Sequence, residues 1–204
     1  MITPPRAARG RGLRWPWPPV VAAAVGLASG AGLLWWMIGG GEPDDPPVRE
    51  VRLPCNLATA AQLDEVLPGA LVVGTSRYGD PGSAPWLLAR CGLARERTAF
   101  YELELELRRY ARQTTTGRHA VSRTAPEKAL AAYESAVDDT DCPPEPVPDI
   151  GDRATGCAGE RAGEPFYRVT AVRGDVLLTA TLRTGDADRG PIHRLAATLL
   201  EAAR

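Results

Sequence analysis

Apolar residues are arranged in three ways along this chain of 204 residues. Near the start, nineteen consecutive residues from Val20 to Ile38 carry no charge. Later segments either alternate with the period of a strand or repeat with the period of a helix. At a rise of about 1.5 Å per residue, the uncharged run would cover most of a hydrocarbon core of roughly 30 Å. The pattern therefore predicts a transmembrane helix at residues 19–38 with a folded domain after it.

The residues that flank the apolar segment indicate its orientation. Basic residues precede it and acidic residues follow it: Arg6, Arg9, Arg11 and Arg14, then Glu42, Asp44 and Asp45. Because positive residues stay in the cytoplasm, we expect a basic cytoplasmic tail at 1–18 and an extracellular C-terminal domain. Two tryptophans at each end match the aromatic belts of a membrane anchor: Trp15, Trp17, Trp35 and Trp36. A cleaved signal peptide and a buried helix of a soluble protein are the alternatives.

The remainder of the chain divides into a linker and one domain. Residues 39–53 are rich in proline and glycine, which predicts an extended spacer. Residues 54–204 are enough for one hydrophobic core. Thr59 and Gln62 have the spacing of a capping box and predict a short first helix. A loop is expected from Gly74 to Pro85.

A hairpin is predicted from strands at residues 86–95 and 99–110, and the second strand alternates strictly. Its apolar residues are expected to face the core: Tyr101, Leu103, Leu105 and Leu107. Its acidic residues are expected to face outwards: Glu102, Glu104 and Glu106. These carboxylates, about 6–7 Å apart, are candidates for binding a cation or a basic partner. The alternative is a solvated face whose charge is offset by the arginines that follow: Arg108, Arg109 and Arg112.

The second half of the domain begins with a helix and a loop. Thr124 and Glu127 form another capping box, with a proline in the first helical turn. The buried side of this helix is predicted to carry Leu130, Tyr133 and Val137. Residues 138–163 show no clear period, so we expect them to form a long loop.

The last elements are a second hairpin and a final helix. Strands are predicted at 166–172 and 176–183, joined by the turn Gly174-Asp175, and Pro191 opens the helix. The order α-β-β-α-β-β-α predicts an α+β fold in which helices pack on one face of an antiparallel sheet of two hairpins. The triplet Arg173-Gly174-Asp175 also occurs in adhesive ligands, but a tight turn needs these residues in any case.

Four cysteines lie in the domain: Cys55, Cys91, Cys142 and Cys157. An even number of cysteines in an exported domain predicts disulfide bonds. Three connectivities are possible. We favour Cys55–Cys91 with Cys142–Cys157, because the second pair closes a short loop rich in proline and glycine. A zinc site is the alternative, although there is no C-x-x-C and the two histidines, His119 and His193, have no metal-ligand spacing to the cysteines.

The composition excludes some functions. The net charge is −1, and the only basic cluster precedes the apolar segment, so nucleic acid is not an expected partner. There is no G-x-S-x-G, no H-E-x-x-H and no phosphate loop with lysine. We therefore predict no catalytic residue, no metal and no cofactor. His119 and His193 are not placed beside a nucleophile by the sequence.

Three short motifs resemble those of a known group. They are Cys55-Asn56-Leu57 before the first helix, Cys91-Gly92-Leu93 in a strand, and residues 147–154 before the second hairpin. In these the domain is similar to extracytoplasmic domains of actinobacterial cell-envelope lipoproteins and membrane-anchored sensors, of the domain-of-unknown-function type. The resemblance implies an α+β fold and a binding or scaffolding role, with no catalytic residues to carry over. Those lipoproteins are anchored by a lipidated cysteine, whereas this chain is expected to use a helix.

These observations predict a non-enzymatic binding or adaptor module of the cell envelope. Its expected partners are the bilayer, through the helix, and an envelope component or a membrane protein, through the sheet face and the loops. The alternative of a different class is an envelope hydrolase or transferase whose site carries no familiar motif.

Overall fold

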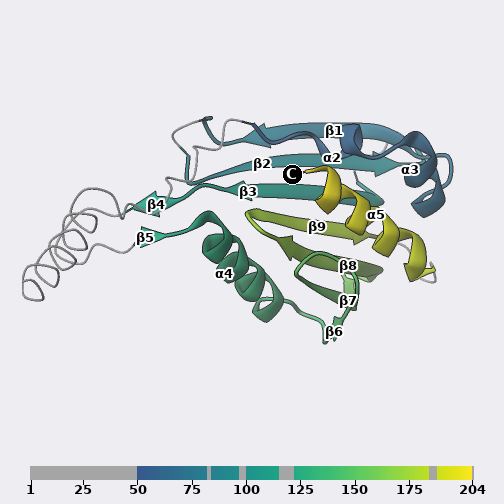
Figure 1. Ribbon diagram of the computed structural model, residues 1–204. Helices are drawn as coiled ribbons and strands as arrows, with labels where there is room; N and C mark the ends of the chain where they lie inside the picture. Colours follow the sequence, from purple (N-terminus) through teal and green to yellow (C-terminus); the bar gives the residue numbers. More distant parts are fainter. Residues whose placement is uncertain (1–49, 82–83, 97–99, 115–121, 184–187, 204) are drawn as a thin grey trace, which may run out of the picture. The chain divides into compact units, whose positions relative to one another are not determined.

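The computed structural model describes residues 50–81, 84–96, 100–114, 122–183 and 188–203. The centre of the described part is one antiparallel sheet of seven strands (Figure 1). Its strands are β1 (Leu71–Tyr78), β2 (Trp86–Ala94), β3 (Leu103–Tyr110), β6 (Pro144–Pro146), β7 (Arg153–Arg161), β8 (Glu164–Arg173) and β9 (Val176–Leu182). A separate small hairpin contains β4 (Gln113–Thr114) and β5 (Ser122–Arg123). The helices are α2 (Pro54–Leu57), α3 (Ala60–Val66), α4 (Ala125–Asp138) and α5 (Arg189–Ala202).

The sheet is made of two meanders that meet at its centre. Its strand order is β1-β2-β3-β9-β8-β7-β6, so the first strands of the chain occupy one half and the last strands the other (Figure 1). The central pair β3 and β9 is in register at Leu105 and Ala180. Both predicted hairpins, β2–β3 and β8–β9, are present. The α+β class is therefore confirmed.

One face of the sheet carries the main core. Leu103, Leu105 and Leu107 of β3 are at most 1% exposed, as their alternation predicted. They join alternate residues of β8 and β9 and the apolar side of α5: Val169, Ala171, Leu178, Ala180, Leu182, Ile192, Leu195 and Leu199. Leu63 and Val66 of α3 belong to the same cluster. We call this the α5 face.

Helix α4 packs against the opposite face, so the prediction that all helices lie on one face is wrong. Its Ala129 and Tyr133 contact Tyr110, Val172 and Leu177. In β8 and β9 these residues alternate with the residues that α5 covers. At this end of the strands both faces are apolar, and a run of consecutive apolar residues does not say which face a helix will cover.

Local sequence signals place the helix ends. Both predicted capping boxes are present, with Thr59 capping α3 through Gln62 and Thr124 capping α4 through Glu127. The side chain of Lys128 ties α4 to the sheet, because its Nζ donates to the carbonyls of Pro85 and Ala111 at 3.0 and 3.1 Å. The final helix is also confirmed. It starts at Arg189, two residues before the predicted opening proline.

Two segments predicted to be loops contain strands. The segment 138–163 contains β6 and β7, and β1 continues through Gly74 to Tyr78, inside the expected loop 74–85. The sequence of β7, RATGCAGER, is rich in glycine and alanine, which are poor strand formers, so its propensity is overridden by pairing with β8 over nine residue pairs. Pairing with neighbouring strands, rather than local sequence, therefore determines that both segments form strands.

The prediction that Tyr101 faces the core together with the leucines of β3 is wrong. β3 begins only at Leu103. The Tyr101 ring instead lies over Gly92 and Gly74, so close that a Cβ on Gly92 would come within 2.3 Å of it. Gly92 is the cross-strand partner of Glu104, so this ring covers the face away from α5. Two glycines in adjacent strands leave the space that the ring fills.

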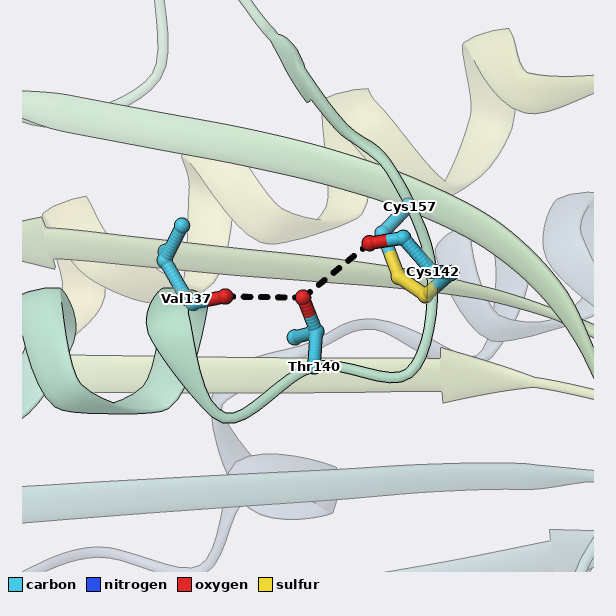
Figure 2. The surroundings of a disulfide bond; sticks show 4 residues. All are labelled: Val137, Thr140, Cys142 and Cys157. Carbon is cyan, nitrogen blue, oxygen red and sulfur yellow. Dashed lines mark hydrogen bonds between the residues drawn. A yellow bond between two sulfur atoms is a disulfide. The ribbon is translucent and has the colours of Figure 1, made fainter.

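The favoured disulfide connectivity is confirmed. Cys55 is bonded to Cys91 and Cys142 to Cys157, with Cα–Cα distances of 6.0 and 5.7 Å. The first bond joins α2 to β2. Figure 2 shows the second, where the Thr140 hydroxyl lies 2.7 Å from the carbonyl oxygen of Val137 and 3.1 Å from that of Cys142. This arrangement connects the end of α4 to β7.

The proposed membrane segment, with Trp15, Trp17, Trp35 and Trp36, lies outside the described residues. Within the described ranges, none of the helices has the length and apolar character needed to cross a membrane. The transmembrane helix at 19–38 and its orientation therefore stay predictions.

Candidate ligand-binding face

Polar side chains form two rows across the sheet on the face away from α5. Cross-strand register places Arg90, Glu106 and Thr179 in one row. The neighbouring row runs through Glu104, Thr181 and Arg168. Directly opposed residues of antiparallel strands point to the same side of the sheet. All six side chains are partly exposed, and we call their surface the charged face.

The half of the charged face on β2 and β3 is an ion-pair network. Arg90 lies between two carboxylates, with its Nε 3.2 Å from Glu104 and its Nη2 2.7 Å from Glu106. Arg108 contacts the other oxygen of Glu106 at 2.5 Å and stacks on the ring of Trp86, 5.3 Å from its centroid. The hydrogen bond that Arg90 donates to Glu106 is the main cause of the raised pKa of Arg90.

All three glutamates predicted as surface-binding residues have arginine partners. Glu102, just before β3, accepts from the Nε and backbone N–H of Arg95 at 2.7 and 2.9 Å, which lowers its carboxyl pKa. Of the arginines expected to offset the row, Arg108 contacts Glu106, whereas Arg109 pairs with Asp175. The sequence alternation could not identify Arg90 and Arg95 as partners, because that needs the hairpin register.

Arg168, on β8, has different surroundings. Among the described residues, its buried Nε has no hydrogen-bond partner, which is also true of Arg90 and Arg108. Unlike theirs, however, the Arg168 guanidinium contacts no carboxylate of the described residues. Its guanidinium lies over the ring of Phe166, 5.4 Å from the centroid. The pKa of Arg168 is lowered, first by burial and then by the positive charge of Arg161. The predicted site residues do not include Arg168, although an arginine inside an apolar strand is an unusual feature of the sequence.

Two hollows flank Arg168 on this side of the sheet. One is open to solvent and is lined by Arg161, Glu164, Phe166, Arg168, Thr181 and Arg183. The other is also open and lies between the end of α4 and β7 and β8, beside the Cys142–Cys157 disulfide. The Tyr133 hydroxyl, on α4, is hydrogen-bonded to that of Thr155 in this second hollow. Arg168 therefore borders both spaces.

His193 lies elsewhere, on the side that α5 covers. Its Nε2 is 2.8 Å from the hydroxyl of Tyr167, and the Arg189 guanidinium stacks on the same tyrosine at 4.6 Å. Burial, and then the charge of Arg189, lowers the pKa of His193. Arg189 also pairs with Glu145 at 3.0 Å. His119 lies outside the described residues.

The Arg173-Gly174-Asp175 triplet forms the β8–β9 turn, as expected. Gly174 has a φ of 53°, which a turn glycine adopts readily. Both flanking side chains are engaged within the chain, Arg173 with Glu201 and Asp175 with Arg109. Among the described residues, no group of three or more histidine, cysteine or acidic side chains is arranged to hold a metal ion.

Comparison with known proteins finds similarity in structure alone. No family model matches the chain, and no curated protein matches it either. Among solved structures, the extracellular domain of PknH from Mycobacterium tuberculosis is similar, with a TM-score of 0.51 and 12% sequence identity. The similarity covers 77% of this chain and 97% of that domain. The chain therefore shares the fold of an actinobacterial extracellular domain, in line with the group that its motifs resemble.

Proposed function

We propose that this protein is a membrane-anchored binding module, with its domain on the outer side of the cell membrane, and that the charged face binds an envelope component or a membrane partner. Two disulfides support an oxidising location. The fold of an extracellular domain supports the same location. The proposed anchor is the helix at 19–38, with the N-terminus in the cytoplasm.

The contrast between the two sides of the sheet carries the proposal. The α5 face is packed with apolar side chains and has a hollow beside Leu107, Val176 and Ala202. The charged face instead holds partly exposed charges, threonines and two hollows around one arginine. Concave sites with a few convergent polar groups are where small ligands bind. The role proposed is binding rather than catalysis, because the glutamates of this face are held by arginines.

The test uses the full chain, exported to an oxidising compartment and purified in a neutral detergent. The protein is incubated with a fractionated envelope extract and analysed by native mass spectrometry. We expect a bound compound that is retained by the wild type and lost in Thr181→Trp, which fills the hollow beside Arg168. The matched control is Arg77→Trp, an exposed strand position whose partner Ala89 belongs to the core under α5.

Each outcome bears on the proposal. Retention by the wild type and by Arg77→Trp, but not by Thr181→Trp, would support the charged face as the binding surface. Equal retention by all three proteins would move the site elsewhere. A compound that is consumed or chemically altered during incubation would contradict a non-enzymatic role.

A further inference from the structure

Three arginines surround one hollow on the charged side of the sheet. Arg161 ends β7, Arg168 lies within β8 and Arg183 follows β9, and all three line the same open hollow. Within the described part of the chain, none of the three side chains makes an ion pair or hydrogen bond. By contrast, the side chains of Arg90 and Arg108, nearby on the same face, contact carboxylates. The positive charge in this hollow is therefore not neutralised by close contacts.

The acidic groups near the hollow do not neutralise its positive charge. Glu164 lines it and is the register partner of Arg161, yet it forms no ion pair with the described arginines. Glu104 and Asp141 act on Arg168 only at a distance, and Glu104 is held by Arg90. One lining carboxylate thus faces three guanidinium groups.

Of the three arginines, Arg168 is the one whose position destabilises the folded state. Burial of a charged group without a partner is unfavourable, and two like charges nearby add to that cost. Its stacking on Phe166 offsets only part of this. An anion between the three arginines would give the buried Nε an acceptor and neutralise the local charge.

We propose that this hollow binds a phosphate group, with Arg168 at its base, Arg161 and Arg183 at its sides and the Thr181 hydroxyl as a further donor. Arginine suits this role because its planar guanidinium makes paired hydrogen bonds to phosphate oxygens. This inference rests on the proposed function, since it names the chemistry that the charged face would recognise. The phosphate belongs either to a soluble molecule or to the headgroup of an anionic lipid.

The direct test observes the arginine Nε–H signals of the full chain by NMR, with ¹⁵N-arginine labelling and a neutral detergent. Inorganic phosphate is added at constant ionic strength, with chloride as the blank. We expect a saturable shift of the Arg168 signal with phosphate but not with chloride. A second arm compares nanodiscs of phosphatidylcholine with nanodiscs that also contain phosphatidylglycerol.

The two arms separate the sources of the phosphate. A shift with inorganic phosphate alone would assign a soluble ligand, and the same shift with phosphatidylglycerol would assign a lipid headgroup. If neither probe moves the Arg168 signal, or if chloride moves it equally, the site does not exist.

Matched variants give an independent measure by calorimetric titration with phosphate. Arg168→Met keeps the apolar stem but removes the charge, and we expect its affinity for phosphate to fall about tenfold or more. Arg168→Lys should restore part of it, because lysine supplies charge without the paired donors. Arg77→Gln, an exposed arginine whose strand partner lies under α5, should bind as the wild type does. Unchanged affinity in Arg168→Met would overturn the assignment.

Failure of this site is distinguishable from failure of the proposed function. A chain that retains an envelope compound through Thr181 but ignores phosphate would keep the binding role and lose the phosphate site. A chain that binds phosphate at Arg168 but retains no envelope compound would do the reverse.

Discussion

The two sides of the central sheet are built from alternate residues of the same strands, yet they differ in almost every physical respect. On the α5 face, leucines of β3 and β9 are buried against α5 with at most 2% exposure. On the charged face, away from the end of the strands that α4 covers, the intervening residues of β3 and β9 are glutamates, threonines and Arg108, and they stay partly exposed. The first side holds most of the buried apolar surface that stabilises the fold. The second side carries charged and polar groups that are available for binding. We therefore expect substitutions on the α5 face to affect stability and substitutions on the charged face to affect binding.

The two disulfides offer the strongest test of that division, because each belongs to one side. Cys55–Cys91 lies with the α5 core, and Cys157 is the register partner of Arg168 on the charged face. The first bond closes a separation of 36 residues and the second one of 15. From loop-closure entropy, replacing both cysteines by alanine should cost about 4 kcal/mol for the first pair and about 3 kcal/mol for the second.

Urea denaturation of the full chain in detergent measures both costs. A smaller loss for the Cys55–Cys91 pair than for the Cys142–Cys157 pair would contradict the order expected from loop-closure entropy. Reduction of the wild type with a thiol reagent is the control, and it should reproduce the sum of the two losses if the sites act independently.

Truncation of one core leucine should have the next largest effect. Leu105 is completely buried at the centre of the sheet, so Leu105→Ala should lower the free energy of unfolding by about 3 kcal/mol. The matched change on the other side is Thr179→Val, which keeps the shape and the β-branch. It should stay within about 0.5 kcal/mol of the wild type in the same denaturation experiment. Similar losses at the two positions would remove the distinction between the faces.

The ion-pair network should contribute less. Arg90→Met leaves Glu104 and Glu106 without the cation that lies between them. We expect a loss of about 1 kcal/mol, reduced because the Arg90 side chain is 36% exposed and screened by solvent. Repeating the denaturation at high salt should shrink the loss. A loss that does not depend on salt would indicate packing rather than charge.

The smallest effect is a pH dependence on the α5 side. Because burial lowers the pKa of folded His193 below its unfolded value, protonation favours the unfolded chain. The stabilisation is complete above the unfolded pKa of about 6.5 and is lost as the pH falls through the lower folded pKa. His193→Gln should flatten the slope of unfolding free energy against pH below about 6.5. An unchanged slope would show that the carboxylates alone determine the acid response.

Much of the fold could be predicted from local signals. The capping boxes at Thr59 and Thr124 placed two helices, and the alternation of Leu103, Leu105 and Leu107 identified the buried side of β3. The disulfide pairing followed from loop composition. These features depend on residues close together in sequence, where period and capping chemistry act directly.

The remaining features depend on contacts between distant segments. The sequence of β7 has a weak strand propensity, and the strand forms because β8 pairs with it. The face that α4 covers is determined by its contacts with Tyr110 and Leu177. The proposed role of Arg168 could not be predicted from the sequence, because it also depends on contacts between distant segments. Its importance comes from Arg161 and Arg183, which only the sheet register brings beside it.

The most direct test combines stability and phosphate affinity in a single variant, Arg168→Met. If Arg168 is kept for binding, its removal should lower phosphate affinity about tenfold while the free energy of unfolding stays equal or rises by up to about 1 kcal/mol. Denaturation and calorimetric titration on one preparation of the full chain give both values. A variant that binds phosphate normally but unfolds more easily would show that Arg168 stabilises the sheet and that the charged face has no phosphate site.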